Sequence, residues 1–262
     1  MSRKVVLVGG MCSNERMLVI LFLAGLSAGF IDAVAGGGGL IAVPALLFTG
    51  MPVPWVLGTN KLQSSCGTVI AVIRYWRAGL IKWHEVWLTM IFSFAFAMLG
   101  AWAVGHVSKD VLKVIVPWLL LSVAVYSLLC PSLGLEARRA RMGPDSYSVL
   151  AGSTLGFYDG FFGPGAGSFW TISLLTLRGM ELTRATGYTK IVNLASNVAS
   201  LLIFLCAGTV HYGYGLVMIA GQLIGARLGS GMVLKHGALF VRRVFLAVVL
   251  ALTARLMWEQ FK

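Results

Sequence analysis

Two lysines and two aspartates lie inside strongly apolar stretches of this sequence, where a charged side chain is costly. Asp32 and Lys61 belong to one stretch, and Asp159 and Lys190 belong to another. Ionisable groups at membrane depth commonly mark a substrate or ion pathway. The lysines are candidates for binding an anion; the alternative is that they lie at the interface and extend their ammonium groups to water. The aspartates could carry a proton, pair with a lysine, or cap exposed backbone N–H groups.

The two apolar stretches are copies of one unit. The first reads GFIDAVAGGGGLIAVPALLFTGMPVPWVLGTNK, and the second reads GFYDGFFGPGAGSFWTISLLTLRGMELTRATGYTK. An offset of 127 residues aligns the two aspartates, and an offset of 129 aligns the two lysines. The change in offset corresponds to a small insertion in the second copy. The chain is therefore an internal repeat, and each half carries one glycine-rich, ionisable segment.

Each copy has a glycine-rich break shortly after its aspartate, at residues 36–39 (GGGG) and 163–167 (GPGAG). A helix that begins after such a break points free N–H groups and a positive dipole end at the gap. Two facing breaks would form an anion site near the bilayer midplane, as in transporters built from inverted repeats. The alternative is that the glycines only permit close helix packing. Two matched breaks, each followed by a polar helix start, favour the transport site.

The predicted site combines the two breaks with the polar residues that follow them. Its substrate-binding residues are Gly36, Gly37, Gly38, Gly39, Asn60, Lys61, Gln63, Gly163, Gly165, Gly167, Lys190, Asn193 and Asn197. Asp32 and Asp159 are the candidates for proton coupling.

The composition is that of an integral membrane protein. The 262 residues are 58% hydrophobic and 11% charged, with a mean hydropathy of +0.86, whereas a soluble domain carries about 25% charged residues. Apolar runs near 20 residues recur along the whole length, as expected for spanning helices. The net charge of +12 is concentrated in short loops, which indicates membrane topology and contact with anionic lipid.

Motifs for enzymatic chemistry are absent from the sequence. The four cysteines are far apart without CxxC spacing, so neither a metal site nor a disulfide framework is indicated. The GGGG run is not a phosphate-binding loop, because no strand precedes it and no GK[ST] follows. We find no nucleophile elbow, zinc signature or nucleic-acid motif. The sequence therefore predicts no enzyme activity, no cofactor, no metal and no nucleic-acid partner.

The site must be positioned by helices that are interrupted at the glycines. Helices are predicted at 17–35, 40–48, 59–74, 83–105, 111–130, 147–162, 168–177, 187–206, 212–234 and 239–258. Residues 50–58, with two prolines, are predicted to form a loop, so each lysine would lie about one turn into a helix. Glycine-rich backbone at membrane depth is tolerated only where it is buried in protein or lines a wet cavity.

Loop charges favour one of two topologies. If each broken pair fully crosses the bilayer, the halves are parallel; if each is re-entrant, the halves are inverted. In this count Lys61 and Lys190 are treated as loop charges on opposite sides of the membrane. The re-entrant arrangement then places most of the basic residues on one side. The predicted fold is therefore an all-α polytopic membrane protein with two inverted repeats, each a re-entrant pair plus three spanning helices. Residues 1–134 form the first repeat, 135–146 a basic cytoplasmic linker, and 147–262 the second repeat.

At these motifs the chain resembles the sulfite exporter TauE/SafE family, also called TSUP transporters. The resemblance is carried by GFIDAVAGGGGLIAVPALL with the following GTNK, and by the second copy GFYDGFFGPGAGSF with GYTK. It covers nearly the whole chain and implies a multi-pass permease of the bacterial inner membrane that works without ATP. The resemblance implies transport of sulfite, thiosulfate, sulfonates or related organic anions. The second copy departs from the first at Pro164, Ala166 and Tyr188, so the half-sites are not equivalent.

These observations predict a secondary transporter of a small, sulfur-containing anion that works by alternating access, with the anion and the lipid bilayer as its partners. Two alternatives remain open at this point. A passive anion channel would show flux that ignores pH and saturates poorly. A membrane scaffold or assembly factor would show no flux and no dependence on the lysines. The sequence leaves open the exact substrate, the direction of transport, the coupling ion and the oligomeric state.

Overall fold

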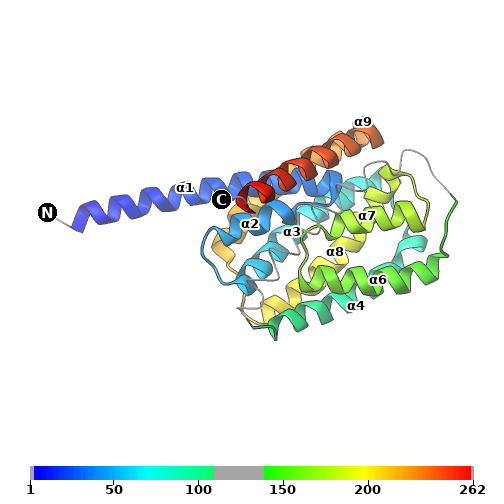
Figure 1. The fold of residues 1–262 in the computed structure, drawn as a ribbon, viewed down its shortest axis with the longest axis horizontal. Helices are drawn as coiled ribbons and strands as arrows, with labels where there is room; N and C mark the ends of the chain where they lie inside the picture. The colour runs from blue at the N-terminus through cyan, green and yellow to red at the C-terminus, as the bar shows by residue number, and fades with distance from the viewer. Residues whose placement is uncertain (1–2, 109–138, 261–262) are drawn as a thin grey trace.

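The computed structural model describes residues 3–108 and 139–260, and all regular secondary structure within these ranges is helical (Figure 1). The helices are α1 (Arg3–Ala35), α2 (Gly39–Leu47), α3 (Val53–Arg77), α4 (Trp83–Gly105), α6 (Pro144–Phe161), α7 (Ala166–Leu177), α8 (Leu182–Cys206) and α9 (Tyr212–Gln260). The predicted all-α class is thus confirmed. The predicted span 111–130, and Arg138 in the basic linker, lie outside the described residues.

The helix bounds follow the internal repeat of the sequence. Helices α3 and α8 are offset by 129 residues at both of their ends, and the starts of α4 and α9 are offset by the same number. Left-handed glycines recur at this spacing too, since Gly50 matches Gly179 and Gly79 matches Gly208. The helix α9 contains a non-helical residue, Gly237, which separates the segments predicted as two helices.

The equivalent helices α3 and α8 cross in opposite directions. The backbone at Gly58, near the start of α3, lies against Phe204 and Thr209 at the end of α8. Near the start of α8, Gly187 lies against Leu80 and Tyr75 at the end of α3. Their middle parts therefore meet, which brings the polar segments of both helices to one level of the bundle.

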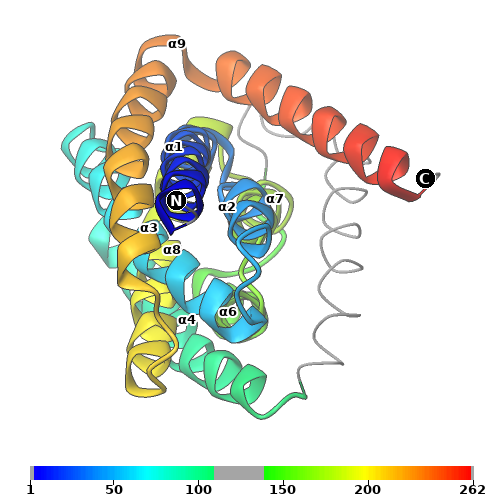
Figure 2. The same cartoon turned by 90° about the vertical axis from the view of Figure 1, so that its left-hand side faces the viewer.

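Glycine-lined seams join each half to the other. Viewed along its axis, α1 lies beside the first part of α9 (Figure 2). A side chain on Gly25 or Gly29 would collide with the α9 backbone at Met218 or Gln222, which shows that the two helices run parallel in close contact. Small residues allow such close approach, and packing then stabilises the helix pair.

The second seam, between α4 and α6, is equivalent to the first. A side chain on Gly156 would meet the backbone of Ser93, and one on Gly100 would meet the carbonyl oxygen of Phe157. At the corresponding place in the first seam, Gly229 approaches the carbonyl oxygen of Phe30. Each seam therefore pairs a helix of one repeat with a helix of the other.

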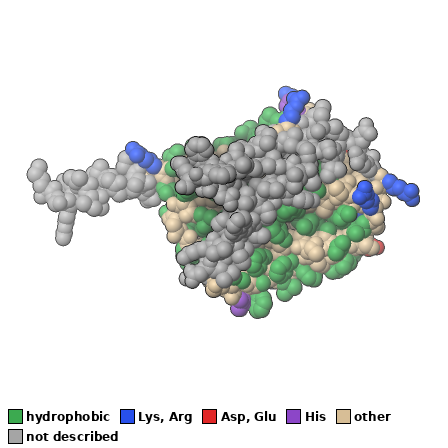
Figure 3. All heavy atoms as spheres, viewed as in Figure 1, with side chains coloured by type: hydrophobic (Ala, Val, Ile, Leu, Met, Phe, Trp, Pro, Cys, Tyr) green, Lys and Arg blue, Asp and Glu red, His purple; other side chains and the backbone are tan. Residues whose placement is uncertain are grey.

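Four of the described helices are long and apolar enough to cross a membrane: Glu15–Ala35, Trp83–Gly105, Leu182–Cys206 and Tyr212–Gly237. Helices α2 and α7, with nine and twelve residues, are too short for a full crossing of about 20 residues. Hydrophobic side chains cover much of the described surface in Figure 3. These features are those of a multi-pass membrane protein.

One end of the bundle gathers basic loops. The backbone N–H groups of Arg141 and Met142 donate to the carbonyl oxygen of Leu177. At the same end, the guanidinium of Arg184 binds the Glu85 carboxylate at 2.5 Å. Lysine and arginine side chains are visible at this end in Figure 3.

Three predicted helix starts are late by five residues or more: α1 begins at Arg3 rather than residue 17, and α3 and α8 also begin earlier than predicted. Helix α3 begins at Val53 rather than residue 59, because proline in the first helical turn needs no N–H partner. Helix α8 begins at Leu182 rather than residue 187, because the Glu181 side chain caps the N–H groups of the first turn. The loop predicted at 50–58 is therefore much shorter.

The buried apolar residues form two clusters with a polar layer between them. Along α3, one cluster ends at Leu57 and the other begins at Ala71. Between them the buried positions are largely polar, from Thr59 to Thr68. The fold thus places a polar layer between two apolar packing regions.

Candidate functional site

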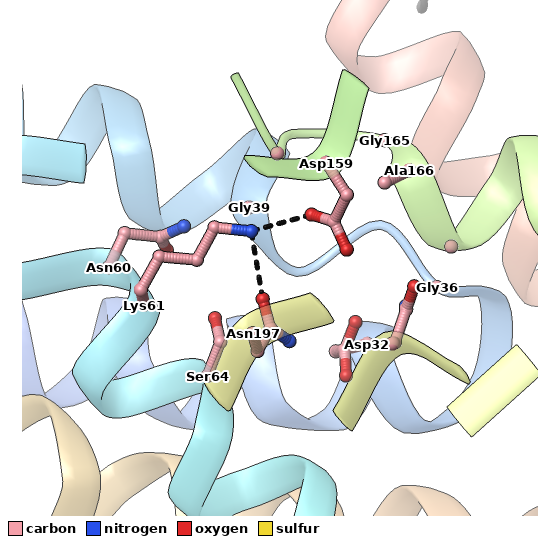
Figure 4. Close-up of a pocket in the computed structure, with 13 residues that line it drawn as sticks. Asp32, Gly36, Gly39, Asn60, Lys61, Ser64, Asp159, Gly165, Ala166 and Asn197 are labelled. Carbon is pink, nitrogen blue, oxygen red and sulfur yellow. Dashed lines mark hydrogen bonds and ion pairs between the residues drawn. The ribbon is translucent and has the colours of Figure 1, made fainter. Parts of the chain in front are cut away.

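A cavity lies in the polar layer, where the ends of α1 and α6 meet the starts of α2 and α7 beside α3 and α8 (Figure 4). Its walls are backbone, carboxylate, amide, hydroxyl and ammonium groups. The lining residues are Asp32, Gly36, Gly39, Asn60, Lys61, Ser64, Asp159, Gly163, Gly165, Ala166, Gly167, Asn193 and Asn197.

The two glycine breaks touch each other at this cavity. A Cβ atom on Gly36 would lie 2.5 Å from the carbonyl carbon of Gly167, and one on Gly39 would lie 3.0 Å from the Cα of Pro164. Gly36 has a φ of 76°, a left-handed conformation that favours glycine. Contact between the breaks therefore requires both the small size and the backbone freedom of glycine.

Lys61 is held by two side chains of the second repeat, Asp159 on α6 and Asn197 on α8. Its Nζ donates to Oδ1 of Asp159 at 2.6 Å and to Oδ1 of Asn197 at 3.0 Å. The other carboxylate oxygen of Asp159 accepts a short hydrogen bond from Ser196. The side chains of Lys61 and Asp159 are 2% and 4% exposed, so this is a buried, hydrogen-bonded ion pair.

Lys190 pairs with the aspartate of the first repeat. Its Nζ lies 3.2 Å from Oδ2 of Asp32, but among the described residues no acceptor lies in hydrogen-bond geometry to that ammonium. Thr68 donates to the same carboxylate oxygen at 3.5 Å. Lys190 is fully buried, whereas the Asp32 side chain is 14% exposed.

The lysine–aspartate pairs therefore cross from one repeat to the other. Of the roles considered for the aspartates, the structure shows pairing with a lysine. The counting of Lys61 and Lys190 as loop charges on opposite sides is wrong, because both side chains are buried in the polar layer. Both lysines also lie more than two turns into their helices, not one, because α3 and α8 begin earlier.

The cavity is small in this structure. The room for the centre of a water-sized sphere is about 20 Å³, which suffices for about one water molecule. An oxyanion would need the side chains to separate. The site can supply backbone N–H groups from the starts of α2 and α7, amide donors, and one or two ammonium groups once an ion pair opens.

Comparison with known proteins identifies the family. The family model described as sulfite exporter TauE/SafE matches residues 21–256. The chain belongs to the TauE/SafE family. It is 41% identical over 243 residues to the probable membrane transporter protein YfcA of Escherichia coli (strain K12), covering 93% of this chain and 90% of the relative.

Two other relatives span the chain equally well. A probable membrane transporter protein of Haemophilus influenzae is 39% identical over 93% of this chain and 96% of its own length. The probable membrane transporter protein ORF9 of Sinorhizobium is 41% identical, with 92% of each chain covered. The resemblance noted from the motifs is therefore confirmed, and the protein is a member of a membrane transporter family.

Most of the predicted TauE/SafE site residues line the cavity, but four do not. Lys190 lies behind Asp32, with which it pairs, and Gly37 and Gly38 are not among the lining residues. The backbone at Gly38 packs against α1, where a Cβ atom would lie 2.6 Å from Asp32 Cβ. Gln63 instead orients a neighbour, since its Nε2 donates to Oδ1 of Asn60 at 2.9 Å.

The prediction missed two lining residues, Ser64 and Ala166. The repeat could have found both, because Ser64 is equivalent to Asn193 at the offset of 129 and Ala166 to Gly39 at the offset of 127. In the described ranges no group of three or more His, Cys, Asp or Glu side chains could hold a metal ion.

Proposed function

We propose that this protein is a secondary transporter of a small anion and that the cavity between the glycine breaks is its substrate site. The proposal depends chiefly on the two lysines buried in one polar layer, one lining the cavity and one directly behind it. Helices α2 and α7 begin at the same place, and their N-terminal dipole ends favour negative charge.

We infer a sulfur oxyanion, such as sulfite, or an organosulfonate as the substrate, and the bacterial inner membrane as the location. The support is the description of the family, sulfite exporter TauE/SafE. The lining residues are compatible with this class, because they are polar or small and carry ammonium, amide and hydroxyl groups that can donate to oxyanions.

We further propose an inverted repeat with re-entrant pairs that works by alternating access. The opposite courses of α3 and α8 and the shortness of α2 and α7 support the inverted arrangement. Opening would move the halves relative to each other around a fixed midplane site.

Asp32 and Asp159 are the proposed coupling groups. Each carboxylate holds one lysine in a neutral pair, so a proton on the carboxylate would release the ammonium for the anion. Coupling of this kind would bring one proton and one anion into the cavity together and leave its net charge unchanged.

An uptake screen in proteoliposomes tests the proposed function. Sulfite, thiosulfate, sulfonates and small carboxylates are offered with and without a pH gradient, and saturable uptake that responds to the gradient is expected for at least one. The Lys61→Met/Lys190→Met variant, reconstituted to the same density, provides the control. Unsaturable flux that ignores pH would indicate a passive channel, and no flux for any anion would indicate a scaffold.

Labelling in intact cells tests the inverted topology. Arg139 is exposed at the basic end of the bundle, and Tyr212 is exposed at the opposite end. In a chain without native cysteines, an impermeant thiol reagent should label Tyr212→Cys from outside but not Arg139→Cys. Labelling of Arg139→Cys from outside would refute the cytoplasmic placement of the basic linker.

A further inference from the structure

The two buried ion pairs are unequal in strength. Lys61 and Asp159 are within 2.6 Å of each other, and both have additional hydrogen-bond partners. Lys190 and Asp32 are 3.2 Å apart without hydrogen-bond geometry in the described part of the chain. Because charge-assisted hydrogen bonds depend on short distance and alignment, the second pair is the weaker one.

This inequality is encoded in the sequence and is not only a property of one conformation. The side chains that hold the tight pair are Ser196 and Asn197. At the offset of 129 their equivalents are Gly67 and Thr68. Gly67 offers no side chain to the carboxylate, and its space is filled by Gln222.

The position of the weaker pair would allow a ligand in the cavity to displace the Asp32 carboxylate from Lys190. Asp32 lines the cavity while Lys190 lies behind it, so movement of the carboxylate alone would expose the ammonium to an incoming ligand. Asp32 has a second partner in Thr68, but that bond is 3.5 Å long, whereas Asp159 cannot move without breaking short bonds to both Lys61 and Ser196. The two carboxylates therefore differ in what it takes to free their lysines.

We propose that Asp32 is a tethered competitor for the substrate, and that the transported anion replaces its carboxylate at Lys190. During this replacement the Lys61–Asp159 pair stays closed and positions the cavity wall, and its opening requires the proposed proton on Asp159. This inference depends on the proposed anion transport. With an attached competitor, the apparent affinity for the anion equals the intrinsic affinity multiplied by the fraction of time that the site is free.

Removal of the competing charge should therefore tighten anion binding. In the purified full chain in detergent, calorimetric titration with sulfite, thiosulfate and acetate should give an apparent Kd about tenfold lower for Asp32→Asn than for the parent, as expected if the pair is closed about nine-tenths of the time. Asp32→Ser provides the same test if Asp32→Asn does not fold. Parental affinity in the folded variant would overturn the inference.

Asp159→Asn is the matched control. Its amide oxygen can still accept from Lys61, and Asn197 keeps its own bond, so the apparent Kd should fall by less than about threefold. Tightening equal to that of Asp32→Asn would overturn the distinction between the pairs.

A double variant tests whether the gain passes through Lys190. In Asp32→Asn/Lys190→Met the tightening should disappear, whereas its survival would overturn the inference. If the parent binds none of the three anions, the proposed function fails and this inference fails with it. If the parent binds an anion and Asp32→Asn binds it no more tightly, only the tethered-competitor role is wrong.

Discussion

The two glycine breaks meet at one cavity, but they require glycine for different reasons. In the first break Gly36 is left-handed while Gly38 has an ordinary helical backbone. In the second break both Gly163 and Gly165 are left-handed. Between them Pro164 stiffens the chain, and its carbonyl oxygen accepts from Tyr158 at 2.8 Å. The first break therefore requires glycine mainly because a side chain would collide with its neighbours. The second requires glycine because its backbone is left-handed.

This difference means that equivalent positions in the repeat do not have equivalent physical requirements. Gly38 and Gly165 align at the offset of 127. At Gly38 a Cβ atom would lie 2.6 Å from the carbonyl oxygen of Ala28, so the lack of a side chain matters. At Gly165 the φ of 79° matters. Substitutions can separate these two requirements.

The largest effect is expected at the lysine beside the second break. Lys61 Nζ would lie 3.2 Å from a Cβ atom on Gly163, and Lys61→Met leaves the buried Asp159 carboxylate without its cation. Loss of one partner of a buried pair costs about 3–5 kcal/mol, so a large fall in thermal stability in detergent is expected. Lys190→Met should cost less stability and instead weaken anion binding by about 1.5–3 kcal/mol. Equal stability losses would contradict the inequality of the half-sites.

A smaller effect is expected at Gly36, in the first break. Gly36→Ala introduces a left-handed alanine, which costs about 1–2 kcal/mol, and also a collision with Gly167. Uptake should fall at least about tenfold, since misplacement by about 1 Å can cost a hundredfold in activity. Gly50→Ala is the control, because Gly50 has nearly the same φ of 77° but nothing within 4 Å of its Cβ position. Similar uptake by both variants would show that contact between the breaks is unimportant.

The smallest effect should come from asparagine in the second break. Asparagine tolerates the left-handed conformation better than other side chains, so Gly165→Asn should retain more uptake and stability than Gly165→Val. The difference should be about 1 kcal/mol in unfolding free energy. Gly38→Asn and Gly38→Val should be equally damaging, because the obstacle there is the α1 backbone. If Gly38→Asn were clearly better than Gly38→Val, backbone conformation rather than lack of space would be the requirement at the first break.

The sequence predicted the components of the site better than their partners. Apolar surroundings identified Asp32, Lys61, Asp159 and Lys190 as buried functional candidates, and the repeat identified them as equivalent. Repeat spacing cannot say which aspartate meets which lysine, because that depends on the antiparallel crossing of α3 and α8. The cross-repeat pairing therefore required the structure.

Helix starts were the other weak point of the prediction. The two prolines in residues 50–58 were interpreted as loop signals, although proline is tolerated in a first turn. The error placed Lys61 about one turn into its helix, and it led to counting a buried charge as a loop charge. The all-α class and most cavity residues were nevertheless accessible from apolar runs and glycine positions, because these depend on composition rather than on exact boundaries.

The glycine-lined seams also bear on how the chain is made. Helix α1 is synthesised well before α9, yet its close contacts at Gly25 and Gly29 are with α9. Until α9 is inserted, this face of α1 must be covered by lipid or by an insertion factor. The two halves therefore cannot complete their folding one after the other, as independent domains do during translation. Their contacts form only after both halves have been synthesised.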